Sequence, residues 1–460
     1  MSSPNPATYR HDGERLATEY LERVVRDGID SAELTAAVDA WPELFENRGR
    51  IMPNPVFLGA GDSALLARQL DDIYNLLVTL PQRRFSGSRA SYARMLGLPE
   101  AQIAVLERAP RDKPPPLARA DLYRTGTGFS LLEMNIGSSL GGFENGEINR
   151  ALTGHPVLAN FVQEKRLTFV DTAESLIGTA LAIHAERSST TPAVALVDWP
   201  DTYARHQPRL EVMAGLCRRA GVDAFTCHLG ELRAEATGLS YRGRHVDVVY
   251  RFYLLEYVSS AADIELLEPL LHAADRGMVT LLSPADADLY GYKEGLALLS
   301  ELVHTEDLDD RERDSVTSLV PWTRRLRTSI DDAAGEPVDA VRFATAKQSE
   351  LILKPVSLHG GSGIVAGWTV SAEEWRRNVA DALDGPYILQ QRVRPVPDPV
   401  LAKQTIEPLY CNWGIFLARP AAATGPAAYS GCLIRASHDP DVDVISMANG
   451  AVIGSCLIAP

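Results

Sequence analysis

The sequence predicts a mixed α/β protein with a helical N-terminal region, and three observations favour this fold class. Short apolar runs alternate with helical patterns from about residue 190, which is typical of an α/β unit with a mainly parallel sheet. Helical periodicity dominates the first hundred residues. Breaks rich in proline and glycine near residues 115 and 335 indicate three regions, which we expect at 1–115, 116–335 and 336–460.

The N-terminal region is expected to be mainly helical. The stretch "DSAELTAAVDAW" opens with Asp30 and has Glu33 three residues later, which is typical of a capping box before apolar residues at helical spacing. Three consecutive prolines in "DKPPPLARADLYR" cannot continue a helix, so they mark the boundary of this region. The next stretch, "GFSLLEMN", predicts a strand that runs into a glycine-rich turn.

The rest of the chain is expected to alternate strands and helices. In the central region we predict strands at 193–199, 223–229, 245–255 and 277–283, with helices at 209–221 and 293–304. A new unit is expected to begin after "DDAAGEPVDA", with strands at 349–355, 363–370 and 387–393 and a helix at 371–383. This alternation favours βαβ connections and a parallel sheet in the central region.

Composition excludes several classes of protein. The formal net charge of −15 argues against a nucleic-acid-binding protein, because binding phosphate requires a basic surface. No apolar run approaches the roughly 20 residues that a membrane span needs. Five scattered cysteines without a C-x-x-C pair indicate reduced, buried thiols and a cytoplasmic location.

The stretch "LILKPVSLHGGSGIVAG" suits phosphate binding. A strand delivers Lys354, a proline follows it, and the glycine-rich "HGGSG" can curl with its backbone N–H groups exposed to phosphate oxygens. The lysine adds a point charge at the same place. This is not a Walker loop, and a hairpin turn with a surface lysine explains the stretch equally well. The following "YILQQRV" could form an adenine-binding hinge through its backbone.

The stretch "EMN" followed by "GSSLGG" admits two chemistries. Glu133 and Asn135 are two residues apart on a predicted strand, so they face one side and offer oxygen ligands suited to Mg²⁺. A half-exposed strand with its polar residues outside is the plain alternative. The "GSSLG" stretch also fits a nucleophile elbow at Ser139, which would need an acid and a histidine further along the chain.

The order of these segments resembles that of the eukaryotic-type glutathione synthetases, a circularly permuted branch of the ATP-grasp ligases. The matching segments run from about residue 115 to the C-terminus: "LLEMNIGSSLGG", "DVVYRFY", "DLYGYKEGLALL", "LILKPVSLHGGSG", "YILQQRV", "NWGIF", "GCLIRAS" and "MANGAVIG". Their order carries the resemblance, since no one of them is specific. The first hundred residues have no match in it.

The resemblance implies a set of site residues. It implies Mg²⁺ ligands at Glu133 and Asn135, and lysines for the phosphates of ATP at Lys293 and Lys354. It places Gly360 and Gly361 in a loop over the phosphates, and Gln390, Gln391 and Asn412 around the nucleotide. It gives Arg251 and Arg435 to substrate carboxylates or the acyl-phosphate, and it has Arg119 and Ser138 line the substrate site.

Several positions depart from the family pattern. Leu358 stands where the family has a third acidic metal ligand, so Glu144, Glu147 or water would complete the metal site. Gln391, Asn412 and Asn449 replace acidic residues of the hinge, the ribose site and the last glycine loop. These changes argue against glutathione as the product.

The resemblance therefore implies an ATP- and Mg²⁺-dependent ligase that joins a carboxylate to an amine through an acyl-phosphate. Amino acids or small peptides would be its substrates, with a γ-glutamyl group as one option. The resemblance favours a homodimer that acts on small molecules. The composition favours a cytoplasmic protein without nucleic-acid or membrane partners. Two alternatives remain open: a serine hydrolase built on Ser139, and a grasp protein that binds ATP without turning it over.

Overall fold

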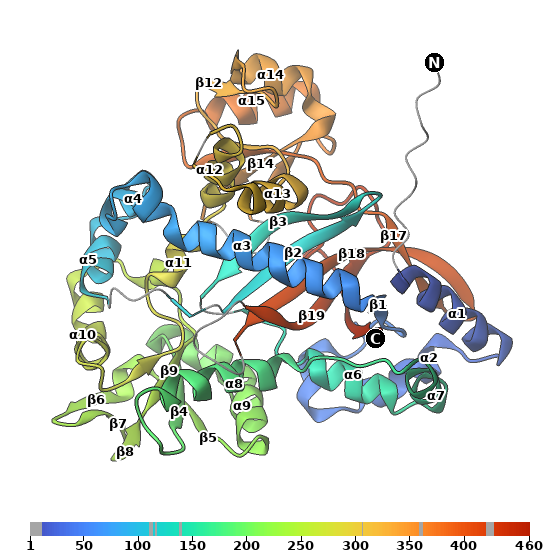
Figure 1. The fold of residues 1–460 in the computed structure, drawn as a ribbon, viewed down its shortest axis with the longest axis horizontal. Helices are drawn as coiled ribbons and strands as arrows, with labels where there is room; N and C mark the ends of the chain where they lie inside the picture. The colour runs from blue at the N-terminus through green and yellow to red at the C-terminus, as the bar shows by residue number, and fades with distance from the viewer. Residues whose placement is uncertain are drawn as a thin grey trace.

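The computed structural model describes residues 12–109, 114–115, 117–137, 140–305, 307–357, 362–419 and 427–460 (Figure 1). The helices are α1 Asp12–Arg26, α2 Ser31–Asp39, α3 Ala60–Arg84, α4 Arg89–Met95, α5 Glu100–Arg108, α6 Asn145–Thr153, α7 Pro156–Lys165, α8 Thr172–Ala185, α9 Pro200–Arg219, α10 Ala261–Asp275, α11 Ala287–Tyr290, α12 Glu294–Leu302, α13 Asp310–Leu319, α14 Ala340–Ala346 and α15 Ala372–Asp381. Short 3₁₀ turns lie at Pro42–Asn47, Leu229–Glu231, Leu255–Tyr257 and Gln348–Glu350. Within the described residues, no helix combines the length and the apolar character needed to cross a membrane.

The strands form five sheets. They are β1 Val56–Leu58, β2 Ala118–Thr125, β3 Gly128–Ile136, β4 Ala193–Asp198, β5 Asp223–His228, β6 Leu232–Glu235, β7 Gly238–Tyr241, β8 Arg244–Val246, β9 Val248–Arg251, β10 Thr280–Leu281, β11 Thr323–Arg325, β12 Ser329–Asp331, β13 Pro337–Asp339, β14 Leu351–Pro355, β15 Val365–Ala366, β16 Tyr387–Gln391, β17 Pro397–Ala402, β18 Thr405–Ala418, β19 Ala428–Ser437 and β20 Val452–Ile458. The largest sheet has the order β1-β20-β19-β18-β2-β3, with β17 also paired to β18.

The N-terminal region is helical, as the sequence predicts, but it also supplies a strand. Asp30 caps α2 by accepting a hydrogen bond from the N–H of Ala32 (2.8 Å). Glu33 contacts His155 instead of closing a capping box. The unpredicted strand β1 pairs in parallel with β20, so this region is joined to the C-terminal end of the chain.

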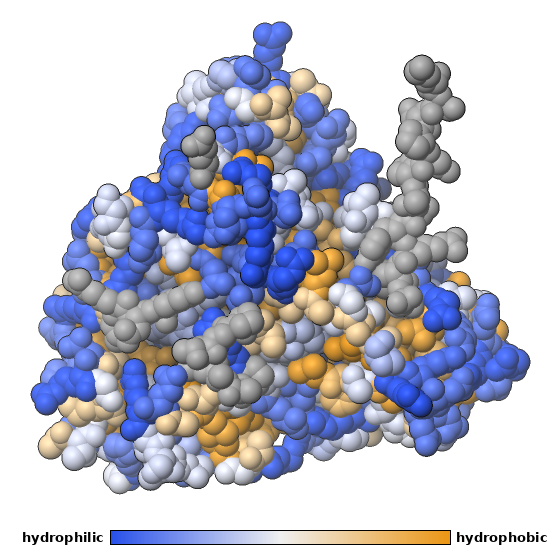
Figure 2. Space-filling view, in the orientation of Figure 1, coloured by the Kyte–Doolittle hydropathy of each residue, from blue (hydrophilic) through white to orange (hydrophobic). Residues whose placement is uncertain are grey.

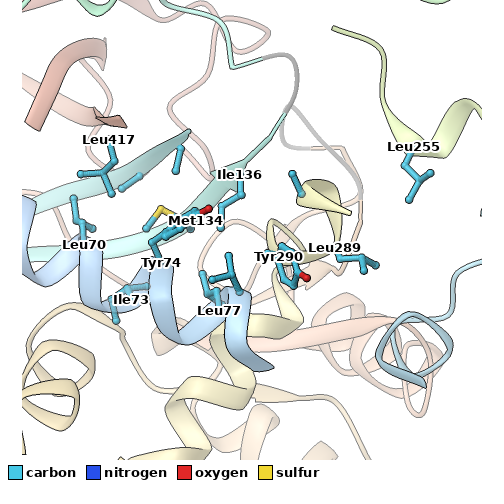
Figure 3. Packing of buried hydrophobic residues seen from close by; sticks show 14 of the residues in the cluster. Leu70, Ile73, Tyr74, Leu77, Met134, Ile136, Leu255, Leu289, Tyr290 and Leu417 are labelled. Carbon is cyan, nitrogen blue, oxygen red and sulfur yellow. The ribbon is translucent and has the colours of Figure 1, made fainter. Parts of the chain in front are cut away.

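One face of the largest sheet is covered by α3, which lies in front of the sheet in Figure 1. Alternation along the strands directs Ala120, Leu122 and Met134 to this face, and these side chains belong to one buried apolar cluster with Leu70 and Leu77 of α3. Figure 3 shows α3 lying along β2 and β3 with its apolar side chains turned toward Met134 and Ile136. The polar residues of β2 and β3 therefore face the opposite side.

The central region contains the predicted parallel sheet. Its order is β10-β9-β4-β5, and all three pairings are parallel. The helices α9 and α12 also occur where periodicity predicts them, although α9 begins nine residues early, at Pro200. The connection between β9 and α10 contains the 3₁₀ turn Leu255–Tyr257.

A smaller sheet stands apart with its own core. Strands β11, β16, β14 and β15 pair antiparallel in that order, and with α14 and α15 they bury an apolar cluster around Trp375. We call this the four-stranded unit. It forms the projection at the top of Figure 1 and is covered mostly by hydrophilic residues in Figure 2.

The three sequence ranges are not separate structural units. The largest sheet takes β1 from 1–115, β2 and β3 from 116–335, and β17 to β20 from 336–460. The four-stranded unit crosses the expected boundary at 335, because its edge strand β11 precedes that position. Short apolar segments predict strands, but they do not tell which distant strands will pair.

Candidate active site

The polar face of the largest sheet and the four-stranded unit enclose a cavity of about 320 Å³. Strands β2, β3, β18 and β19 contribute one wall, and β14 and β16 contribute another. The segments 254–256, 288–293 and 440–446 complete it. Nine of the residues proposed from the sequence line this cavity together: Arg119, Glu133, Asn135, Lys293, Lys354, Gln390, Gln391, Asn412 and Arg435.

Lys293 lies at the start of α12, between the four-stranded unit and the largest sheet. Its backbone N–H donates to the carbonyl of Val356, just beyond β14 (3.2 Å), which fixes α12 against the four-stranded unit. Its Nζ lies 3.5 Å from Oε2 of Glu133 on β3. Lys293 is therefore a buried cation directly beside the proposed metal ligand.

Lys354 projects from β14 into the same cavity. Its Nζ donates to Oε1 of Gln390 (2.6 Å), and Gln390 donates through Nε2 to Oγ1 of Thr323 (3.1 Å), so three adjacent strands fix the lysine. Burial lowers the pKa of Lys354 to about 8; Glu133 opposes this shift and Lys293 adds to it. Two buried ammonium groups thus share one site with the carboxylate of Glu133, which balances only one of them, so the site favours an added anion.

The wall on the largest sheet carries a compact network around Asp121. Arg119 donates to Asp121 through Nε (2.9 Å) and Nη2 (3.2 Å), and Arg435 on β19 lies 2.7 Å from Oδ2 of Asp121. Burial alone would raise the pKa of Asp121, but the two guanidinium groups outweigh it and hold that pKa well below its usual range. The network carries one net positive charge, which suits a substrate carboxylate or phosphate.

Glu133 and Asn135 lie side by side on β3, as their spacing predicts. Nδ2 of Asn135 lies 3.2 Å from Asp121 and 3.4 Å from Oε1 of Glu133. The described part of the chain holds no group of three or more acidic, histidine or cysteine side chains that could bind a metal alone. One carboxylate and one amide oxygen fit Mg²⁺, which commonly takes its remaining ligands from water and phosphate.

Neither glutamate proposed as a third ligand reaches this site. Glu147 is buried elsewhere, where Trp41 donates to it (2.7 Å) and Arg150 and Arg219 form ion pairs with it. Glu144 lines a different, smaller cavity and accepts a hydrogen bond from Asn47 (3.3 Å). Neither glutamate completes the metal site, because both are held by other partners and neither lines the cavity that contains Glu133.

Arg251 does not line the cavity, contrary to the role implied for it. It is 2% exposed, and its Nη atoms form an ion pair with both carboxylate oxygens of Asp288 (2.6 and 2.9 Å). Its remaining donors go to the backbone carbonyls of Tyr253, Ser283 and Pro284. All five N–H groups are thus used within the protein, so the arginine holds the cavity wall rather than a substrate carboxylate.

The four-stranded unit is fastened to the largest sheet across the cavity edge. Nε1 of Trp368 donates to the carbonyl of Asp441 (2.9 Å), and Arg392 forms an ion pair with the carboxylate of Asp441. The guanidinium of Arg392 also lies over the Trp368 ring, 4.0 Å from its centroid. We call Trp368, Arg392 and Asp441 the clasp. Asn449 lies nearby, but it bonds to Asp443 and Val444 and does not line the cavity.

Some of the expected residues lie outside the described residues. They are Ser138 and Ser139, which follow β3 in the sequence, and Leu358, Gly360 and Gly361, which follow β14. No histidine among the described residues lines the cavity. The lining therefore gives no support to the serine-hydrolase alternative.

Sequence reasoning missed several cavity residues. Asp121 lies two residues after Arg119 on β2, and so shares the face of Glu133 and Asn135, but no strand is predicted at β2. The 440–446 segment and the clasp had no such signal. They reach the cavity through pairing of distant strands, which no local pattern reports.

Known structures resemble this chain in fold. A glutathione synthetase-like effector from Globodera pallida, in its apo form, aligns with a TM-score of 0.53 and 12% identity, over 93% of this chain and 97% of that one. A candidate γ-glutamylcysteine synthetase from Methylobacillus flagellatus aligns over 86% and 87% of the two chains with 14% identity, but its TM-score of 0.40 is too low to carry an argument. Neither a protein-family model nor a curated protein sequence matches the chain. The first likeness covers nearly the whole of both chains and shows a glutathione synthetase-like fold.

Proposed function

We propose that this chain is an ATP-dependent ligase that forms an amide bond between a carboxylic acid and an amine. In this proposal it is a circularly permuted ATP-grasp enzyme of the cytoplasm, where its five buried, unpaired cysteines stay reduced. The observation that carries the proposal is the meeting of Lys293, Lys354 and Glu133 in one cavity between the largest sheet and the four-stranded unit. A homodimer remains part of the proposal.

The part of the cavity next to β16 suits a purine. Apolar side chains of Leu132, Ile352 and Val393 line it, and Val393 lies just beyond the end of β16. A flat heteroaromatic ring gains from apolar surfaces and needs only a few polar partners for orientation. Gln391 and Asn412, which replace acids of the family pattern, offer neutral hydrogen-bonding groups to a nucleoside at the same place.

The lysines suit the triphosphate. Two buried ammonium groups offset the charge of phosphate oxygens, and the low local dielectric makes their effect larger than it would be in water. Glu133 and Asn135 are the residues that would hold Mg²⁺, which supplies additional charge neutralisation when bound. The pKa of Lys354, near 8, rises again once phosphate lies beside it, so the lysine is charged in the complex.

The reaction needs positioning more than a protein nucleophile. A carboxylate oxygen attacks the γ-phosphorus and ADP leaves; the amine nitrogen then attacks the acyl carbon, phosphate leaves, and the nitrogen loses a proton. Arg119 and Arg435 hold the acid and the acyl-phosphate oxygens through their network with Asp121. Alignment of the two substrates and exclusion of water supply much of the rate.

One observation favours a second candidate, a grasp protein that binds ATP without turning it over. The proposed metal ligands amount to one carboxylate and one amide, and among the described residues no group of three or more acidic, histidine or cysteine side chains could hold a metal ion. Binding of ATP without chemistry is the expected behaviour if this set fails to place the ion.

The test is release of ADP from ATP and Mg²⁺ in the presence of pairs of acids and amines, with the condensed product detected by mass. The ligase predicts that ADP release requires both an acid and an amine and matches the amide formed one for one. ADP release that needs no amine would contradict the proposal. Thermal stabilisation by ATP without ADP release across a broad panel would favour the second candidate.

A further inference from the structure

The cavity wall formed by Leu254, Leu255, Glu256 and Asp288 sets the charge of the substrate group that reaches it. We call this the distal wall. It lies in the central region, whereas the cavity's arginines on β2 and β19 belong to the largest sheet. What this wall can bind depends on Arg251, the arginine directly behind it.

Arg251 cannot bind an incoming carboxylate here, because Asp288 already occupies it. The two side chains form a two-pronged ion pair, with N–O distances of 2.6 and 2.9 Å, and three backbone carbonyls use the other donors. The guanidinium also packs 5.4 Å from the centroid of the Tyr253 ring. The pair is internally neutral, so the arginine's charge is not offered to the cavity.

The surrounding chain is built to keep Asp288 in this position. The N–H of Leu255 donates to Oδ2 of Asp288 (2.7 Å), which ties the distal wall to α11. Gly137, at φ +101°, packs so closely that a Cβ there would lie 2.9 Å from Cβ of Ala287 and 3.0 Å from Oδ1 of Asp288. Three segments thus converge on the ion pair, and a substrate carboxylate would have to displace all of them.

The remaining charge of the distal wall is negative. Glu256 is exposed on the turn Leu255–Tyr257 and lines the cavity, and no described lysine or arginine forms an ion pair with it. Its neighbours Leu254, Leu255 and Tyr292 present apolar surface. An aliphatic chain that ends in a cation matches this surface, whereas a carboxylate meets a like charge.

We infer that the substrate group at the distal wall is an alkyl amine, positively charged at neutral pH, and not a carboxylate. This inference rests on the proposed function, because it treats the cavity as a substrate site, and it adds the class of substrate. An enzyme whose arginine at the position of Arg251 binds a substrate carboxylate would have the opposite preference.

The test compares three amino acids of similar length: ornithine, glutamine and glutamate. Their shared α-amino acid head can act as either the acid or the amine, so only the side-chain end differs. Affinities are measured by titration calorimetry on the full chain with Mg²⁺ and a non-hydrolysable ATP analogue. Ornithine is expected to bind at least about tenfold more tightly than glutamate, with glutamine between them.

Two variants test whether the distal wall causes the difference in affinity. Glu256→Lys is expected to reverse the order, and because Glu256 is exposed the fold should be retained. Glu265→Lys makes the same charge change on an exposed site of α10 outside the cavity and should leave the order unchanged. Tighter binding of glutamate, no binding of any of the three, or an unchanged order in Glu256→Lys would overturn the inference.

ADP release is measured in parallel on the same proteins. Tight binding of ornithine without ADP release for any pair would remove the proposed ligase function and leave the charge preference intact. ADP release that proceeds better with glutamate at this site would keep the ligase and overturn the inference.

Discussion

The two walls of the cavity are built differently. On the largest sheet, Arg119, Asp121 and Arg435 lie on paired central strands and form one network with a single net positive charge. The four-stranded unit has its own core and meets the opposite rim through the clasp of Trp368, Arg392 and Asp441. The first wall is a fixed electrostatic frame, and the second belongs to a separately packed unit.

The largest expected effect comes from breaking the fixed wall. Asp121→Asn leaves two buried arginines without their shared carboxylate, so we expect the free energy of unfolding to fall by about 3–5 kcal/mol. Denaturant titration measures this loss, with the exposed Glu265→Gln as a control. Because the folded pKa of Asp121 is depressed, its contribution is present above the unfolded value of about 3.9 and is lost as pH falls toward the folded pKa. A loss below 1 kcal/mol would contradict a network built on Asp121.

Lys354→Ala tests the charge that the four-stranded unit brings to the cavity. Removing one preorganised charge from a phosphoryl-transfer site should lower kcat by about 10²–10³ while the core around Trp375 persists. Steady-state ADP release measures it, with circular dichroism for the fold. Lys347→Ala is the matched control, since Lys347 is exposed on the same unit and outside the cavity. Equal loss in both variants would contradict the assignment.

The pH dependence of kcat/KM for ATP also tests the charge of Lys354. Lys354 has a pKa of about 8 in the free protein, so its positive charge is lost as pH rises through that value. We expect kcat/KM for ATP to decline with a midpoint near pH 8, because this parameter reports the free enzyme. Its unfolded value is higher, about 10.4, so stability from this residue rises with pH between the two values. Lys354→Arg should move the decline above pH 9; a profile that is flat to that pH in the wild type would refute the shift.

The smallest effect is expected at the clasp. Asp441→Asn removes an ion pair whose acid is 69% exposed, so we expect the attachment of the four-stranded unit at the clasp to weaken by only about 0.2–1 kcal/mol. The hydrogen bond from Trp368 to the backbone carbonyl should remain. The apparent affinity for ATP should fall up to about fivefold and lose part of its dependence on salt. A hundredfold loss would mean that the clasp does more than fasten the rim.

Local patterns in the sequence predict much of this molecule. The alternation of strands and helices identifies the parallel sheet, and strand spacing places Glu133 and Asn135 side by side. The meeting of Lys293 and Lys354 is not a local property: the resemblance in segment order brings the two lysines together, and the structure places both in one cavity. What escaped prediction depends on partners far apart in the chain.

Arg251 shows why a motif alone can mislead. The stretch "DVVYRFY" places an arginine at a strand end, where a substrate carboxylate would be expected. Asp288, 37 residues later, turns that arginine into a structural ion pair. The pairing depends on the packing of α11 against the turn at Gly137, which the sequence does not reveal. Likewise β1 joins the largest sheet through partners 400 residues further along the chain, which no local pattern reports.

Titration calorimetry of ATP with Mg²⁺ against the wild type, Lys293→Met and Lys354→Met tests the central claim most directly. The claim is that these two lysines, from different parts of the fold, hold one triphosphate. It predicts binding of one ATP per chain, weakened at least about tenfold by each substitution. Undiminished binding in both variants would contradict it.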